Sequence, residues 1–133
     1  MDKIVPDAYQ DLLTDEKRAF AYLATTMKDG TPQVTPVWFN HDGIHILVNS
    51  AVGRVKDRNM RSHPDVALVI ADPQNPYRYI QIRGTVVNVT SENAREHIDA
   101  LSKKYTGQER YAGPATDIRV IYKILPKHLN GMG

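Results

Sequence analysis

Two Asp-Gly dipeptides constrain the fold of this chain more than any other feature. Asp29-Gly30 and Asp42-Gly43 each lie between segments in which apolar and polar residues alternate. Glycine tolerates a positive φ and aspartate accepts local hydrogen bonds, so such dipeptides favour the tight turns of β-hairpins. The first 50 residues are therefore predicted to form three antiparallel strands, at residues 19–27, 32–40 and 44–48.

Further strands are predicted in the second half of the chain. Residues 66–71 are apolar on both faces and lie between two prolines, which is typical of a central strand. Residues 77–89 predict one long strand, with Gly84 at a bulge or a barrel corner. Alternation over residues 118–124 predicts a last strand, which we expect Pro126 to end. Pro36 cannot donate to a ladder, so the second strand is expected to be interrupted or at an edge there.

Helical periodicity is strongest over residues 91–105, which predict one long helix capped by Thr90 or Ser91 and ended by Gly107. Residues 6–13 and the segment before Pro64 predict shorter helical stretches. Six short strands cannot make two large sheets, and a small closed barrel removes their edges most economically. We therefore expect a single domain over residues 1–133, mainly β with one long helix (α+β).

Composition excludes several classes of protein. The chain has no cysteine, which excludes disulfides, thiolate metal sites and cysteine nucleophiles. The five histidines form no HExxH pattern, and we expect no metal site. A net charge of +2 is too small to indicate a nucleic-acid partner. No apolar run approaches the ~18 residues that span a bilayer, and the first 13 residues have no apolar signal core. We expect a cytoplasmic protein with no membrane partner.

Sequence motifs of the common catalytic machineries are also absent. There is no GxSxG, GxGxxG or GxxxxGK[ST] pattern, and the acidic residues form no evident pair. If the chain is an enzyme, a bound cofactor is expected to carry the chemistry. No catalytic side chain is assigned.

A phosphate cradle is predicted where the third strand leads into a helix. Asn49 and Ser50 end the strand, Gly53 makes a turn, and Arg54 and Lys56 open the helical stretch. Backbone N–H groups at a helix start point toward an anion, and the two cations supply charge. The alternative is a solvated basic turn.

A second candidate motif lies at the start of the long strand. Tyr77 and Tyr79 are predicted on one strand face, as a platform for a planar ring or a partner surface, and Arg78 on the other face could meet an anion. The alternative is that both tyrosines are packing residues. Trp38, beside Pro36, either lines a flat pocket or packs in the core.

Taken together, these residues resemble the split-barrel flavin and deazaflavin superfamily that includes pyridoxamine 5′-phosphate oxidase. The resemblance covers residues 20–125, and the blocks at residues 72–79 and 82–84 look most like the small oxidoreductases that use coenzyme F-420. It implies a six-stranded antiparallel split β-barrel of the FMN-binding type. It also implies a homodimer with two cofactors at the interface.

The resemblance implies specific roles for these residues. Asn49, Ser50, Arg54 and Lys56 would bind the cofactor phosphate. The backbone of Thr35, Pro36, Val37 and Trp38 would run along the flavin or deazaflavin ring. Tyr77, Arg78 and Tyr79 would approach from the same site or from the partner subunit. The chain lacks the longer C-terminal substrate-binding segment of true pyridoxamine-phosphate oxidases, so vitamin B6 oxidation is not expected.

The function expected is that of an oxidoreductase that transfers a hydride between coenzyme F-420 and a small electrophilic substrate. F-420 has a long anionic tail, and Arg54, Arg58 and Arg61 fall near one helix face that could bind it, unless that face is simply solvated. The alternatives are an FMN-dependent oxidoreductase and a non-catalytic carrier of a flavin or deazaflavin. A barrel that binds single-stranded nucleic acid is disfavoured, because cations and aromatics do not interleave along one strand.

Overall fold

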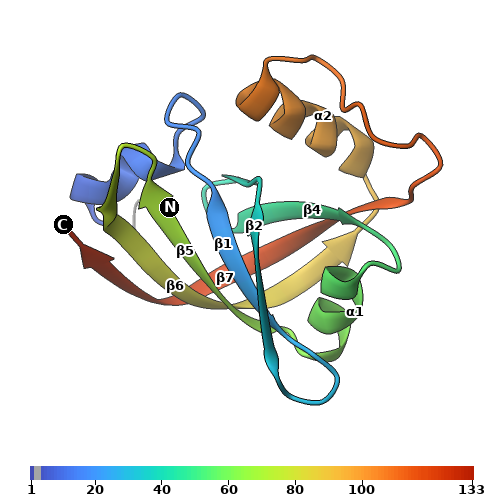
Figure 1. Ribbon diagram of the computed structural model, residues 1–133, viewed down its shortest axis with the longest axis horizontal. Coiled ribbons are helices and arrows are strands. Elements are labelled where there is room, and N and C mark those ends of the chain that lie inside the picture. Colours follow the sequence, from blue (N-terminus) through green and yellow to red (C-terminus); the bar gives the residue numbers. More distant parts are fainter. Residues whose placement is uncertain (2–3) are drawn as a thin grey trace.

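One antiparallel sheet forms the body of the computed structural model, which describes Met1 and residues 4–133 (Figure 1). Its strand order is β2-β1-β5-β6-β7-β4-β3. The strands are β1 (Ala21–Thr26), β2 (Pro32–Val37), β3 (Asn40–His41), β4 (Ile46–Ala51), β5 (Asp65–Asp72), β6 (Asn75–Thr90) and β7 (Arg119–Met132). The helices are the 3-10 helix η1 (Asp7–Leu13), α1 (Val55–Ser62) and α2 (Ala94–Thr106).

The predicted hairpins are confirmed, but the predicted count of six strands and one long helix is wrong. A seventh strand, β3, forms because the chain turns after Trp38 and Asn40 then pairs with Leu47 of β4. The two shorter helices accompany α2. The strand order is linear, with β2 and β3 at its edges, so the barrel is split and not closed. Pro36 lies on the edge strand β2, where its missing N–H is tolerated.

A bulge at Gly84 shapes the long hairpin of β6 and β7. The pairing register shifts between Arg83 and Gly84, as predicted. A Cβ added at Gly84 would lie 2.6 Å from the carbonyl oxygen of Leu125, so only glycine permits this approach. The prediction that Pro126 ends the last strand is wrong. Pro126 pairs opposite this bulge, and β4 pairs only as far as Ile124, so β7 continues with β6 as its single neighbour.

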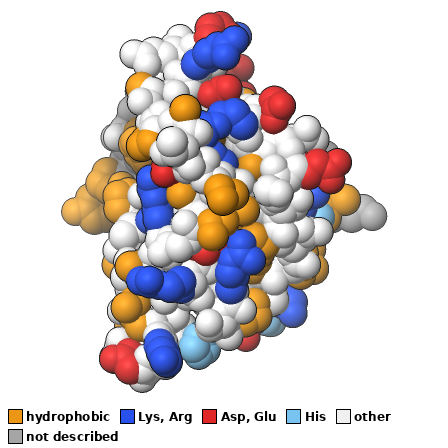
Figure 2. Space-filling view, turned by 90° about the vertical axis from the view of Figure 1, so that its right-hand side faces the viewer, with side chains coloured by type: hydrophobic (Ala, Val, Ile, Leu, Met, Phe, Trp, Pro, Cys, Tyr) orange, Lys and Arg blue, Asp and Glu red, His pale blue; other side chains and the backbone are white. Residues whose placement is uncertain are grey.

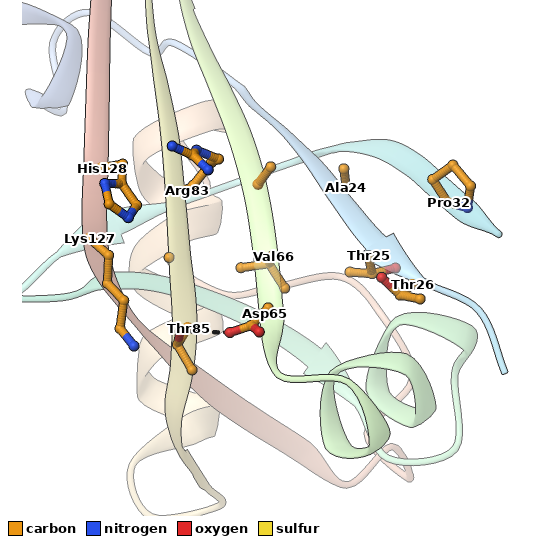
Figure 3. A pocket seen from close by; sticks show the side chains of 12 residues that line it. Ala24, Thr25, Thr26, Pro32, Asp65, Val66, Arg83, Thr85, Lys127 and His128 are labelled. Carbon is orange, nitrogen blue, oxygen red and sulfur yellow. Dashed lines mark hydrogen bonds between the residues drawn. The ribbon is translucent and has the colours of Figure 1, made fainter. Parts of the chain in front are cut away.

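The bulged hairpin borders a groove on the sheet face opposite the core (Figure 3). Arg83, Lys127 and His128 project there, and Thr85 donates to the Asp65 carboxylate at 2.9 Å. The opposite face of the sheet carries the core. Its largest fully buried side chains are Tyr122, Phe39, Leu12, Leu23, Ile46, Met60, Leu68, Ile70, Ile80, Ile82, Leu101 and Ile124.

Helix α2 packs over β4 and β7 and closes one side of the core (Figure 1). Its predicted cap at Thr90 or Ser91 is wrong: the residue before the helix is Asn93, in a left-handed conformation with φ 59°. The Thr90 hydroxyl instead accepts from the N–H of Glu92, which turns the chain before the helix begins. Gly107 ends α2 at φ 81°, as predicted. Among the residues described, no helix is long and apolar enough to cross a membrane.

Candidate functional site

A cavity of about 240 Å³ brings together most of the predicted site residues. Its lining comes from the end of β2, from β4, from the start of α1, from α2 and from the beginning of β7. The lining residues are Pro36, Val37, Trp38, Asn49, Ser50, Arg54, Lys56, Ile98, Leu101, Tyr111 and Arg119. Thr35 immediately precedes this wall on β2. The cavity thus gathers the four residues of the predicted cradle and three of the four residues predicted along the ring.

The turn before α1 is held by a buried carboxylate. Gly53 adopts φ 93°, and its N–H donates to Asp57 Oδ2 at 2.9 Å. Tyr122 and Arg61 donate to Asp57 Oδ1 at 2.6 and 2.8 Å. Burial by itself raises the pKa of Asp57, but these hydrogen bonds outweigh it and hold the pKa below its ordinary value. An ionised Asp57 therefore fixes the loop that presents Arg54 and Lys56.

Arg119 also lines the cavity, and the sequence analysis did not select it. Its side chain is buried, Nε donates to Asn49 Oδ1 at 2.8 Å, and the guanidinium lies 5.1 Å from the centre of the Tyr111 ring. It is the first residue of β7, paired with Ala51 at the end of β4. A cation directly before three apolar or aromatic residues at the start of the strand was the available signal. The pairing of β7 with β4, which brings Arg119 to the predicted cradle, forms between segments far apart in the sequence.

Two buried polar atoms of the cavity lining have no hydrogen-bond partner among the residues described: Ser50 Oγ and Arg119 Nη1. Thr35 Oγ1, on the strand that leads to the cavity wall, is also unpartnered among these residues. The nearest carboxylate oxygen to Arg119 Nη1, in Asp117, is 3.7 Å away, beyond hydrogen-bond reach. A buried unsatisfied donor costs about 1–3 kcal/mol, so such groups are rare in the absence of a ligand or water. Their gathering around one cavity indicates a site for a polar ligand.

The charge of the cavity favours an anion. Arg54, Lys56 and Arg119 line it, and none of its lining residues in the described structure is acidic. Asp117 lies at its margin and pairs with Arg54 at 3.1 Å. Burial, and then the neighbouring Arg54, lower the pKa of Lys56. A bound anion would offset this repulsion. Basic and hydrophobic side chains lie next to each other across this side of the molecule (Figure 2).

Trp38 forms a rigid wall of the cavity. Its ring stacks on Tyr105 at 5.4 Å with an interplanar angle of 9°, and Tyr111 meets it edge-on at 6.1 Å. Tyr105 is fixed in turn, because its hydroxyl donates to the carbonyl of Ala19 at 2.6 Å. Trp38 therefore both packs and lines the cavity, as a flat apolar surface beside the basic cradle.

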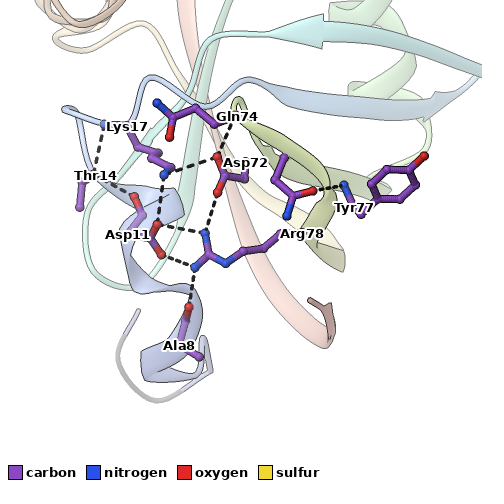
Figure 4. Close-up of polar contacts among 9 residues, drawn as sticks. Ala8, Asp11, Thr14, Lys17, Asp72, Gln74, Tyr77 and Arg78 are labelled. Atoms are coloured by element: carbon purple, nitrogen blue, oxygen red, sulfur yellow. Dashed lines mark hydrogen bonds and ion pairs between the residues drawn. The ribbon is translucent and has the colours of Figure 1, made fainter.

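The second motif lies away from this cavity, and Figure 4 shows its polar contacts. Arg78 contacts two carboxylates, Asp11 at 2.5 Å and Asp72 at 3.1 Å, and also donates to the Ala8 carbonyl. These bonds raise the pKa of Arg78, with the hydrogen bond to Asp11 the largest cause. Tyr77 is 82% exposed. In the described structure, none of Tyr77, Arg78 and Tyr79 lines the cavity.

Two of the cations expected to bind an anionic tail also lie apart from the cavity. Arg61 donates to the buried Asp57, as described above. Arg58 borders a different hollow, lined in part by Met27 and His63. Positive charge beyond Arg54 and Lys56 comes instead from Arg119 inside the cavity.

Comparisons with known proteins agree with this geometry. A family model described as "Pyridoxamine 5'-phosphate oxidase" matches residues 5–133. A structure described as an F420 reductase has 34% sequence identity and a TM-score of 0.82, covering 95% of this chain and 98% of that one. A search of curated proteins finds no match.

Two more distant structures share the fold. A conserved hypothetical protein of Mycobacterium tuberculosis is 20% identical, with a TM-score of 0.73 over 99% of this chain and 88% of that one. A FAD-binding protein of Mesorhizobium loti is also 20% identical, with a TM-score of 0.65 over 96% and 94% of the two chains.

Proposed function

This chain belongs to the pyridoxamine 5′-phosphate oxidase family and is an oxidoreductase of that family, and from this premise we propose that its cofactor is coenzyme F-420. The observation that carries the proposal is a basic cavity with a flat aromatic wall, in which Ser50 Oγ and Arg119 Nη1 are buried without a partner among the described residues. The similarity to a structure described as an F420 reductase supports the choice of cofactor.

The residues present fit such a cofactor. Arg54, Lys56, Arg119 and the Ser50 hydroxyl would hold its phosphate, since charge-assisted bonds to phosphate are the strong ones. The ring would lie along the wall from Pro36 to Trp38. When bound, a deazaflavin supplies a hydride to an electrophilic substrate. The chain contributes position and electrostatics, and we assign it no proton donor, because solvent can protonate the product.

An FMN-dependent oxidoreductase is the second candidate, favoured by the family match. FMN ends at its phosphate, whereas F-420 continues into an anionic tail. We expect tighter binding of F-420 than of FMN, by a margin that narrows as salt rises because exposed charges are screened. Trp38 is the single tryptophan and lines the cavity, so quenching of its fluorescence should report titration by either cofactor. Equal or stronger binding of FMN at low salt would refute the preference.

A kinetic measurement distinguishes an oxidoreductase from a non-catalytic carrier of the cofactor. Reduced F-420 bound to an oxidoreductase should lose its hydride to an electrophilic acceptor faster than free reduced F-420 does. We expect this acceleration to disappear when Trp38 is replaced by alanine, because the deazaflavin ring would lose the flat surface beside which it lies. Tight binding with no acceleration for any acceptor in a broad panel would favour the carrier.

We further propose a homodimer in which the sheet face opposite the core meets a second copy. Tyr22, Val34 and Tyr77 are exposed apolar residues of β1, β2 and β6. Pairing of these faces would bring Tyr77 and Tyr79 of one subunit toward the cofactor of the other. Light scattering should give about twice the 15.0 kDa mass of one chain. A monomer that binds the cofactor tightly would contradict this arrangement.

A further inference from the structure

Four hydrogen-bonded polar side chains, of which two are buried and two half-buried, connect β3 through α2 to the cavity. His97 Nε2 lies 2.7 Å from Asn40 Oδ1, and His97 Nδ1 lies 3.0 Å from Asn49 Nδ2. Asn49 Nδ2 also donates to the carbonyl of Ala94 at 2.8 Å, and Asn49 Oδ1 accepts from Arg119 Nε at 2.8 Å. We call these four side chains, Asn40, His97, Asn49 and Arg119, the polar relay.

The hydrogen-bond pattern assigns one protonation state to His97. An amide nitrogen only donates, so His97 Nδ1 must accept from Asn49 and carries no proton. His97 Nε2 then carries the ring proton and donates to Asn40 Oδ1. Burial first, and then the charge of Arg119, lower the pKa of His97 to about 4. The neutral ring is therefore the form present at physiological pH.

The relay changes the role expected of Asn49. Both of its amide hydrogens are used, one by Ala94 and one by His97, so none is left for an anion. Arg119 differs, because only its Nε is committed to the relay. Its Nη1 is buried at the cavity and has no hydrogen-bond partner in the described part of the chain. The Nη1 side of the Arg119 guanidinium is thus held in one orientation at the cavity and is already shielded from water.

We infer that Arg119 binds the anionic group of the cofactor directly, and that His97 and Asn49 are positioning residues that act through it. The identity of the ligand rests on the proposed function, but the relay itself does not. A guanidinium presents a planar fork that matches two oxygens of a phosphate or carboxylate. Because Asn49 already holds Arg119 at Nε, the Arg119 side chain loses little conformational entropy when a ligand binds. The contribution of Arg119 to affinity therefore depends on an intact polar relay.

Two substitutions of His97 separate positioning from general structural damage. His97→Asn keeps an acceptor near the position of Nδ1 and therefore keeps Asn49 in place. His97→Gln reaches the position of Nε2, so it keeps the contact with Asn40 and loses the acceptor for Asn49. We expect His97→Asn to bind F-420 within about threefold of the wild type and His97→Gln to bind at least about tenfold more weakly. Equal affinities of the two variants would overturn the positioning role.

Arg119→Lys tests the direct contact, since it keeps the charge and removes the fork. We expect the affinity for F-420 to fall on the order of tenfold to a hundredfold. Thermal unfolding of each variant identifies any that fails to fold, and affinity is compared among the folded ones. A folded Arg119→Lys variant with wild-type affinity would refute the assignment.

Nitrogen NMR of the unliganded protein tests the relay without a cofactor. The expected spectrum has His97 protonated at Nε2 and bare at Nδ1, with a slowly exchanging Arg119 Nε–H. Titration with inorganic phosphate should then shift the Arg119 signals more than the Asn49 side-chain amide. The opposite tautomer, or a shift confined to Asn49, would overturn the inference. If neither F-420 nor FMN binds, the proposed function is refuted, whereas the assigned hydrogen bonds of His97, Asn49 and Arg119 are still tested by the NMR spectrum.

Discussion

Replacing Tyr122 by phenylalanine should destabilise the protein through one hydrogen bond. Tyr122 is fully buried, and its hydroxyl donates to Asp57 Oδ1 at 2.6 Å. Phenylalanine keeps the ring packing and removes only this donor. A hydrogen bond to a charged group contributes about 1.5–3 kcal/mol, so we expect the free energy of unfolding at pH 7 to fall by that amount.

The expected loss depends on pH in a defined direction. The folded pKa of Asp57 is lowered below the unfolded value of 3.8. Its bonds therefore stabilise the fold above that value, and this stability disappears as the pH falls through the folded pKa. The difference between the wild type and Tyr122→Phe should be largest near neutral pH and shrink below pH ~4.

Urea unfolding followed by circular dichroism measures the effect, and Tyr105→Phe provides a matched control. The Tyr105 hydroxyl donates at the same 2.6 Å, but to the neutral carbonyl of Ala19, and it accepts from the Phe39 N–H at 3.3 Å. Its loss removes neutral hydrogen bonds only, at about 0.5–1.5 kcal/mol each, and this cost should not depend on the ionisation of Asp57. Because Asp57 also accepts from the Gly53 N–H, Tyr122→Phe should weaken cofactor binding as well. A stability loss in Tyr122→Phe that stays as large below pH ~4 as at pH 7, like that expected of Tyr105→Phe, would refute the reasoning.

Three further predictions concern the cradle, the bulge and the relay. Arg54→Ala and Lys56→Ala should each weaken F-420 binding on the order of tenfold or more, and unchanged affinity in both titrations would remove the cradle from the site. Gly84→Ala should lower the free energy of unfolding by about 1–3 kcal/mol in urea, because its Cβ would meet the carbonyl of Leu125; a neutral effect would contradict the packing. The folded pKa of His97 is about 4, below its ordinary 6.5, so the unfolded chain binds more protons between these values and stability should fall by about 3 kcal/mol as the pH drops from 6.5 to 4. This fall in stability between pH 6.5 and 4 should be absent in His97→Asn. An equal fall in that variant would show that other titrating groups cause it.

The chain's local patterns determined its hairpins, its long helix and the position of the cradle. Asp29-Gly30 and Asp42-Gly43 make turns because of backbone conformations that belong to the residues themselves. Gly84 could be placed at a bulge for the same reason. Ser50, Arg54 and Lys56 are close in sequence, so a strand followed by a helix start sufficed to gather them. Such features depend on interactions within a few residues.

Tertiary structure alone decided which distant groups complete the site. The pairing of β4 with β7 brings Arg119 beside Asn49, and the packing of α2 brings His97 to both Asn40 and Asn49. The fold also moved Arg78 into an ion pair with Asp11 and away from the cavity. No local propensity specifies these contacts, because they form between segments far apart in the chain and are selected by burial and hydrogen-bond satisfaction in the assembled core.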